Sequence, residues 1–128
     1  MKTLAALGIA LGLVATNVGA KGIVCHIDYG GERLQLAVQA AADPFAVQPV
    51  AVGSYLLFRA VVSPPDVPAA SVRIFVYADR DEGPVPIHVA EYPHPLGARQ
   101  SKPGFTGWQS VYEPVRDGEL QYWCARSS

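Results

Sequence analysis

This chain has few of the residues that most often carry out chemistry or bind charged partners. Its 128 residues include two cysteines, one methionine and three histidines, and only 16% of them are charged. The 10 basic and 11 acidic residues leave a net charge of −1, without a run of like charge. Nucleic acids and anionic membrane surfaces bind clustered Lys and Arg, so neither is expected as a partner.

Motifs of covalent and redox catalysis are absent as well. The chain has no GxSxG sequence, and its two cysteines lack CxxC spacing. The carboxylates available for an acid pair are Asp79, Asp81, Glu82 and Glu91. Three of these fall in "ADRDEGP", which is typical of a solvated hairpin turn. We therefore expect no enzymatic activity and no cofactor, with an acid-pair enzyme as a distant alternative.

The longest apolar run lies at the N-terminus. "MKTLAALGIALGLVATNVGA" places Lys2 before an apolar stretch, with Val18 and Ala20 at positions −3 and −1 of a cleavage site. This layout is typical of a secretory signal peptide, and the stretch is shorter than the roughly 20 residues of a spanning helix. We predict a signal peptide over residues 1–20, a single domain over residues 21–128 without a membrane span, and a periplasmic or secreted location in a bacterium.

Segments in which apolar and polar residues alternate recur along the rest of the chain. "RLQLAVQ" sets Leu34, Leu36 and Val38 on one face, as expected of a half-buried strand. The same alternation predicts these buried residues: Leu56, Phe58, Ala60, Val62, Val72, Ile74, Val76, Ala78, Val85, Ile87 and Val89. Turn signals such as "YGGE", "SPPDVPAA" and "YPHPLG" separate the segments. The pattern predicts an all-β fold, an antiparallel Greek-key, immunoglobulin-like β-sandwich of about seven strands.

The two terminal segments place both cysteines on faces that a core would bury. In "GIVCHID", Cys25 lies on the same face as the isoleucines, and in "GELQYWC", Cys124 lies on the same face as Leu120 and Tyr122. Two buried cysteines in an exported chain are expected to form a disulfide. We predict a Cys25–Cys124 bridge that stabilises the fold and joins the two ends of the domain.

The C-terminal "LQYWCA" resembles the immunoglobulin signature, in which a tyrosine stands two residues before the second cysteine. Tyr122 and Cys124 have this spacing, and Leu120 fits the buried position before them. Immunoglobulin domains place a core tryptophan shortly after the first cysteine, whereas Trp108 precedes the second one here. Because the resemblance is limited to the segment "LQYWCA", it favours a Greek-key sandwich but implies no function.

The three histidines are candidate metal ligands, because imidazole is the commonest transition-metal ligand. His26 and His88 are both predicted on the outward faces of their strands, and His94 follows in the loop "YPHPLG". If the two strands were neighbours, the three side chains would meet on the outer surface. A metal-binding protein that uses these surface histidines is our alternative function.

Aromatic residues near the C-terminus point to a binding surface. Tyr92, Trp108, Tyr112 and Trp123 are candidate members, and Trp123 is predicted to face away from the core. Large aromatic rings on a solvent-facing surface usually contact a binding partner. If a second sheet packed on this surface, the same rings would be ordinary core residues. We predict an exported, non-catalytic binding or accessory protein whose partner is a protein, a small ligand or a second copy of the chain.

Overall fold

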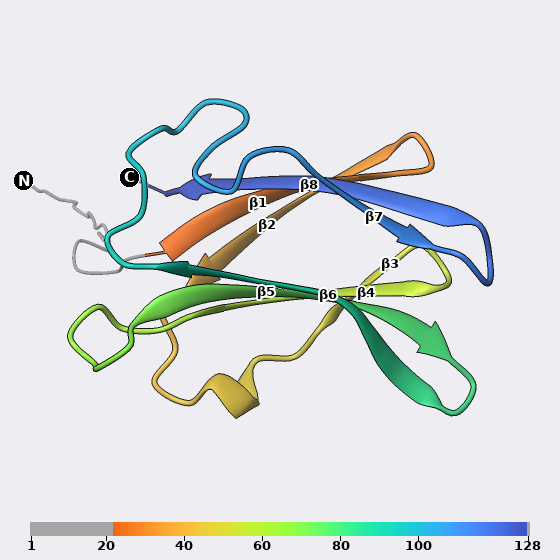
Figure 1. Cartoon of the computed structure of the whole chain (residues 1–128), viewed down its shortest axis with the longest axis horizontal. Coiled ribbons are helices and arrows are strands. Elements are labelled where there is room, and N and C mark those ends of the chain that lie inside the picture. Colours follow the sequence, from red (N-terminus) through yellow and green to blue (C-terminus); the bar gives the residue numbers. More distant parts are fainter. Residues whose placement is uncertain (1–21, 128) are drawn as a thin grey trace, which may run out of the picture.

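The computed structural model describes residues 22–127, which form two four-stranded antiparallel sheets packed face to face (Figure 1). The first sheet has the order β2 (Glu32–Gln39), β1 (Gly22–Tyr29), β8 (Gly118–Arg126), β7 (Gln109–Glu113). The second has the order β3 (Val50–Val52), β4 (Leu56–Val62), β5 (Ser71–Arg80), β6 (Gly83–Pro93). The predicted all-β sandwich is confirmed, while the predicted signal peptide, residues 1–20, lies outside the described residues.

Two tight hairpins show how local sequence sets the strand register. Gly30 and Gly31 join β1 to β2 with φ angles of 59° and 82°, the left-handed conformations that a type I′ turn requires. Asp81 and Glu82 join β5 to β6, so the acidic stretch is the hairpin turn that its composition predicts. These carboxylates therefore lie at a turn between two strands.

Two longer connections carry the chain from one sheet to the other. Residues 40–49 include a short 3-10 helix, η1 (Pro44–Ala46), and are anchored by Arg59, which donates hydrogen bonds to the carbonyl oxygens of Val47 at 2.9 Å and Pro44 at 2.6 Å. This connector ends in β3, the strand that the sequence pattern did not predict. Residues 94–108 lead from β6 back to β7 and rise above the first sheet in Figure 1.

The core lies between the sheets and follows the predicted alternation on β4 and β5. All eight residues predicted to be buried there are at most 2% exposed: Leu56, Phe58, Ala60, Val62, Val72, Ile74, Val76 and Ala78. Tyr122 is also fully buried and packs its ring edge against Phe58, with 5.4 Å between ring centres. Period-two patterning therefore predicts the central strands correctly.

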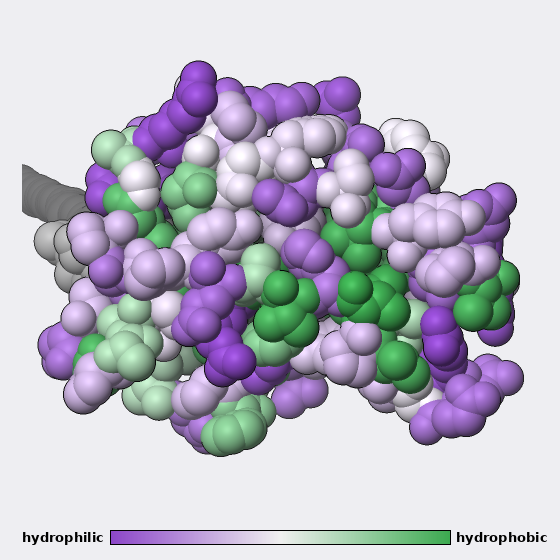
Figure 2. Space-filling view, viewed as in Figure 1, coloured by the Kyte–Doolittle hydropathy of each residue, from purple (hydrophilic) through white to green (hydrophobic). Residues whose placement is uncertain are grey.

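The prediction for β6 is wrong beyond its first residues, because a β-bulge interrupts the alternation. Tyr77 pairs with Pro86 while Val76 pairs with His88, which leaves Ile87 as the extra residue. An extra residue reverses the faces that follow it. Val89 is consequently 55% exposed instead of buried, and His88 faces the core instead of solvent. Strongly hydrophobic residues over β6 are visible on the side shown in Figure 2.

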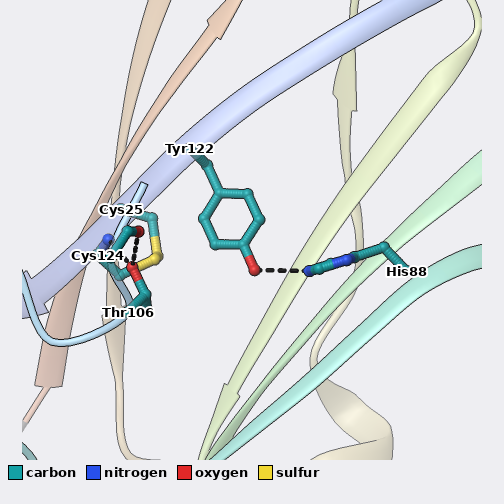
Figure 3. Close-up of a disulfide and its surroundings, with 6 residues drawn as sticks. Cys25, His88, Thr106, Tyr122 and Cys124 are labelled. Atoms are coloured by element: carbon teal, nitrogen blue, oxygen red, sulfur yellow. Dashed lines mark hydrogen bonds between the residues drawn. A yellow bond between two sulfur atoms is a disulfide. The ribbon is translucent and has the colours of Figure 1, made fainter. Parts of the chain in front are cut away.

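The predicted disulfide between Cys25 and Cys124 is present (Figure 3). Both cysteines are fully buried. They are directly paired neighbours on β1 and β8, within one sheet. The immunoglobulin bridge joins two sheets instead, and the second sheet here is a simple meander, so the Greek-key, immunoglobulin-like detail of the prediction is not confirmed. A structural disulfide indicates a protein that folds outside the reducing cytoplasm.

The two sheets are also linked at one end by a buried ion pair. The Arg80 guanidinium at the end of β5 donates to the carboxylate of Glu113 on β7 at 3.0 Å, and that carboxylate is 2% exposed. Burial raises the pKa of Glu113, but hydrogen bonds from the backbone N–H of Arg116, from Arg80 and from the N–H of Val115 outweigh it, so the net pKa lies below its usual range. The carboxylate is therefore held in its charged form.

Candidate binding site

The outer face of the first sheet carries a stacked pair of aromatic rings. His26 on β1 lies directly opposite Trp123 on β8, and the two rings stack with centres 4.0 Å apart and planes 11° from parallel. The disulfide joins the residues immediately before His26 and immediately after Trp123. The covalent bridge therefore fixes the two strands at the position where the rings meet.

A pocket of about 360 Å³ lies beside this aromatic pair. Its lining consists of His26, Ile27, Asp28, Arg33, Leu34, Gln35, Lys102 and Trp123. The β1–β2 hairpin pairs His26 with Gln35 and Asp28 with Arg33, so the four polar side chains gather on one face of the hairpin. The tight Gly30–Gly31 turn thus determines which polar residues border the rings.

The loop of residues 94–108 supplies the remaining wall. The Phe105 N–H donates to the Cys124 carbonyl oxygen at 3.0 Å, and the Cys124 N–H donates to Thr106 Oγ1 at 2.9 Å, so the loop continues the pairing of β7 along the edge of β8. Gly104 allows this approach. It has a φ of 65°, and a Cβ there would overlap the Cys124 carbonyl oxygen and lie 3.0 Å from the Trp123 ring.

Lys102 enters the pocket wall from this loop and is itself held by an aromatic ring. Its Nζ lies 4.2 Å from the ring centre of Trp108, which is a cation–π distance. Trp108 is 38% exposed and acts here as a support for the ammonium group. The cation is thereby kept near the pocket without a carboxylate partner among the described residues.

The charged groups of the pocket favour a ligand that carries negative charge. Arg33 and Lys102 are positive, and Asp28 is the single carboxylate of the lining. Asp28 lies 3.6 Å from the Arg33 guanidinium, whose side chain is 88% exposed, so much of the guanidinium stays open to solvent. The pocket therefore combines ring surfaces with cationic donors and a carboxylate acceptor.

The predicted aromatic surface is divided by the fold. Trp123 borders the pocket, Trp108 supports Lys102, and Tyr112 on β7 is 56% exposed with its hydroxyl donating to Asp117 at 2.5 Å. Tyr92 does not belong to this surface. It follows the β6 bulge, faces the core and packs edge-on against the Phe105 ring at 5.4 Å. The prediction for Tyr92 is therefore wrong for the same reason as the one for His88.

The structure does not bring the three histidines together. His26 lies on the outer face of the first sheet, whereas His88 lies inside the sandwich and shares a hydrogen bond of 2.7 Å with the Tyr122 hydroxyl (Figure 3). His94 follows β6 in the loop. The predicted meeting of His26 and His88 fails because β1 and β6 belong to different sheets. Within residues 22–127, no three His, Cys, Asp or Glu side chains are placed to hold a metal ion together.

Burial shifts the pKa values of His88 and Tyr122, which are hydrogen-bonded to each other inside the core. Burial lowers the pKa of His88, because the charged imidazolium would lose its hydration. Burial also raises the pKa of Tyr122, and the neighbouring Tyr92 hydroxyl adds to that effect. Both side chains are therefore neutral at physiological pH and serve as a polar link between the sheets.

The outer face of the second sheet carries a different aromatic group. Phe75 and Tyr77 on β5 stack with ring centres 6.1 Å apart. The guanidinium carbons of Arg59 and Arg73 lie 4.9 Å and 5.4 Å from the centre of the Phe75 ring. Two cations of the chain itself therefore lie over the Phe75 ring.

Four polar residues of the pocket were not among the candidates selected from the sequence: Asp28, Arg33, Gln35 and Lys102. Arg33 and Gln35 could have been predicted, because a two-residue Gly30–Gly31 turn pairs them with Asp28 and His26. Lys102 could not have been predicted, since its position depends on how a long loop returns to β8. Separately, none of the helices in the described part of the chain is long and apolar enough to cross a membrane.

No protein-family model matches the chain, and no curated protein and no solved structure matches it either.

Proposed function

We propose that this chain is an exported, non-catalytic binding protein of a bacterial periplasm or extracellular space, and that its ligand binds at the pocket beside His26 and Trp123. The observation that carries the proposal is a stacked aromatic pair that borders a pocket of about 360 Å³ with two cations on its lining. Pockets of small ligands combine aromatic surface with a few convergent polar groups in this way.

The disulfide supports this function by making the site rigid before a ligand arrives. Cys25 and Cys124 neighbour the two stacked residues along their strands, so the bridge limits movement of β1 against β8. A preorganised site loses less conformational entropy on binding. The disulfide also supports export, because such bonds persist in oxidising compartments.

The proposal is tested by ligand titration of the purified, oxidised protein followed by amide NMR spectra. The panel contains neutral sugars, uronic acids, amino acids, dicarboxylic acids and nucleotides. We expect at least one class to shift the amide signals around His26 and Trp123, and we expect Trp123→Ala to abolish those shifts. Phe45→Ala is the matched control, because Phe45 is 87% exposed and does not line the pocket. A panel without any such shift, or with shifts confined to another face, would contradict the proposal.

Location is tested separately by fractionating cells that express the full chain. We expect the disulfide-bonded form in the periplasm or medium, shortened by removal of the predicted signal peptide. Recovery of the full-length chain in the cytoplasm with two alkylatable thiols would contradict export.

A further inference from the structure

We infer that the pocket takes a small saccharide that carries a carboxylate group, such as a uronic acid. This inference rests on the proposed function and narrows it to one class of ligand. Four features of the pocket support it: the ring pair, the two cations, the single carboxylate and the volume.

The ring pair of His26 and Trp123 favours a ligand with an apolar surface. His26 and Trp123 project from neighbouring strands with their rings stacked on each other, and both residues line the pocket. A sugar ring has C–H groups that pack on aromatic surface and hydroxyl groups around its edge. A small inorganic anion has no such surface and would leave the rings unused.

The polar lining matches the edge of a sugar that is acidic. Asp28 accepts hydrogen bonds from hydroxyl groups, and Gln35 both donates and accepts them. Arg33 and Lys102 supply charge-assisted donors for a carboxylate, and the planar guanidinium suits a carboxylate particularly well. Asp28 lies beside Arg33, so with a neutral sugar in the pocket it is Lys102 that would have no partner of opposite charge among the described residues.

The position of Lys102 strengthens this assignment. Its ammonium is held over Trp108 at 4.2 Å, which restrains a long and otherwise flexible side chain near the pocket. The pocket volume of about 360 Å³ lies at the small end of small-molecule sites, so it suits roughly one or two sugar rings. A longer acidic polymer would therefore be held through one short segment.

The test compares glucuronic and galacturonic acids with glucose and galactose by calorimetric or NMR titration of the oxidised protein. We expect the uronic acids to bind about tenfold more tightly than the neutral sugars, since one charge-assisted hydrogen bond accounts for a change of that size. Lys102→Gln should remove most of this preference. Arg99→Gln is the charge-matched control, because Arg99 is exposed and does not line the pocket, and it should leave the preference intact.

Added salt gives an independent readout. If the preference depends on exposed cations, raising the salt concentration should reduce it, because ions screen such interactions. Equal affinity for neutral and acidic sugars, or equal affinity for acetate and a uronic acid, would overturn the inference. Binding of a ligand other than a sugar at His26 and Trp123 would overturn it too, yet leave the proposed function standing. If no compound of the full ligand panel, sugars included, binds at the pocket, both this inference and the proposed function are overturned.

Discussion

The two outer faces of the sandwich both carry aromatic rings but differ in what surrounds them. On the second sheet, two arginines lie over the Phe75 ring at 4.9 Å and 5.4 Å. On the first sheet, His26 and Trp123 border a pocket, and the nearby Lys102 lies over a different ring, that of Trp108. The first face therefore keeps ring surface and cations beside a space that a ligand can enter.

Under the proposed function, similar residues serve stability on one face and recognition on the other. Arg59 covers a ring and also donates hydrogen bonds to two carbonyl oxygens of the connector, so its donors are already used within the fold. Arg33 has one carboxylate neighbour and an 88% exposed side chain, so it retains free donors. Free hydrogen-bond donors, more than the number of aromatic residues, distinguish the proposed binding face from the other face.

Removing the disulfide should have the largest effect and should weaken the binding face more than the other. By the loop-entropy estimate, a double Cys25→Ala, Cys124→Ala variant loses about 4.7 kcal/mol of unfolding free energy, since the bridge spans 99 residues. Denaturant unfolding measures that loss. Hydrogen exchange should show a greater loss of protection in β1 and β8 than in β4 and β5. An equal change in both sheets would contradict the view that the bridge mainly holds the binding face.

The loop that closes the pocket should be sensitive at Gly104. Gly104→Ala is expected to cost about 3 kcal/mol, because it adds left-handed backbone strain and overlaps the Cys124 carbonyl oxygen. Gly107→Ala is the matched control, since Gly107 also has a positive φ but its Cβ would meet its nearest atom at 3.9 Å. It should cost about 1 kcal/mol. Equal losses in thermal or denaturant unfolding would show that close approach to β8 is unimportant.

The buried His88, which is hydrogen-bonded to Tyr122 between the two sheets, should make the stability of the protein depend on pH. Because burial lowers the pKa of His88 in the folded protein, the unfolded chain binds a proton more readily. The stability due to neutral His88 is present above the ordinary histidine pKa of about 6.5 and is lost as the pH falls toward the lower folded-state value. His88→Gln should cost about 1.5 kcal/mol at pH 8, through a weaker bond to Tyr122, and should remove this acid-dependent loss.

The matched control for that variant is His26→Gln, which changes a histidine on the outer face. Denaturant unfolding is measured from pH 8 to pH 5 for both variants. The control should keep the acid-dependent loss that His88→Gln removes. A wild-type stability that stays constant over this range would contradict the role assigned to His88.

The smallest effects are expected on the second face, where the two arginines can be compared. Arg59→Gln should cost about 1 kcal/mol, because it removes hydrogen bonds to the connector as well as a cation–π contact. Arg73→Gln should cost less than about 0.5 kcal/mol, since it removes an exposed cation–π contact. Neither change should alter ligand binding at the first face, as measured by titration. Weakened binding in either variant would mean that the second face also takes part.

Local patterns predicted the central strands well and the strand β6 poorly. Alternation assigned Phe58 and Ile74 correctly to the core, because a regular strand sends every second side chain to the same face. On β6 the bulge at Ile87 reversed that rule, so Val89 moved outward and His88 inward. A bulge arises from pairing with another strand, and the apolar pattern of one segment does not encode it.

The candidate site was predicted in part. Both cysteines and the outward direction of Trp123 follow from alternation within one strand. The stacking of Trp123 on His26 depends on which residues of β1 and β8 lie opposite each other. The chain positions of these two strands are far apart, so the pairing is a property of the assembled sheet.

By itself the sequence determined the class of fold, the two cysteines that pair, and the faces that regular strands bury. These follow from side-chain direction, which depends only on neighbouring residues in a strand. Only the tertiary structure decided that His88 lies inside, that His26 meets Trp123, and that Lys102 reaches their pocket. Each of these depends on strand register or loop path, and the packing of distant segments sets both.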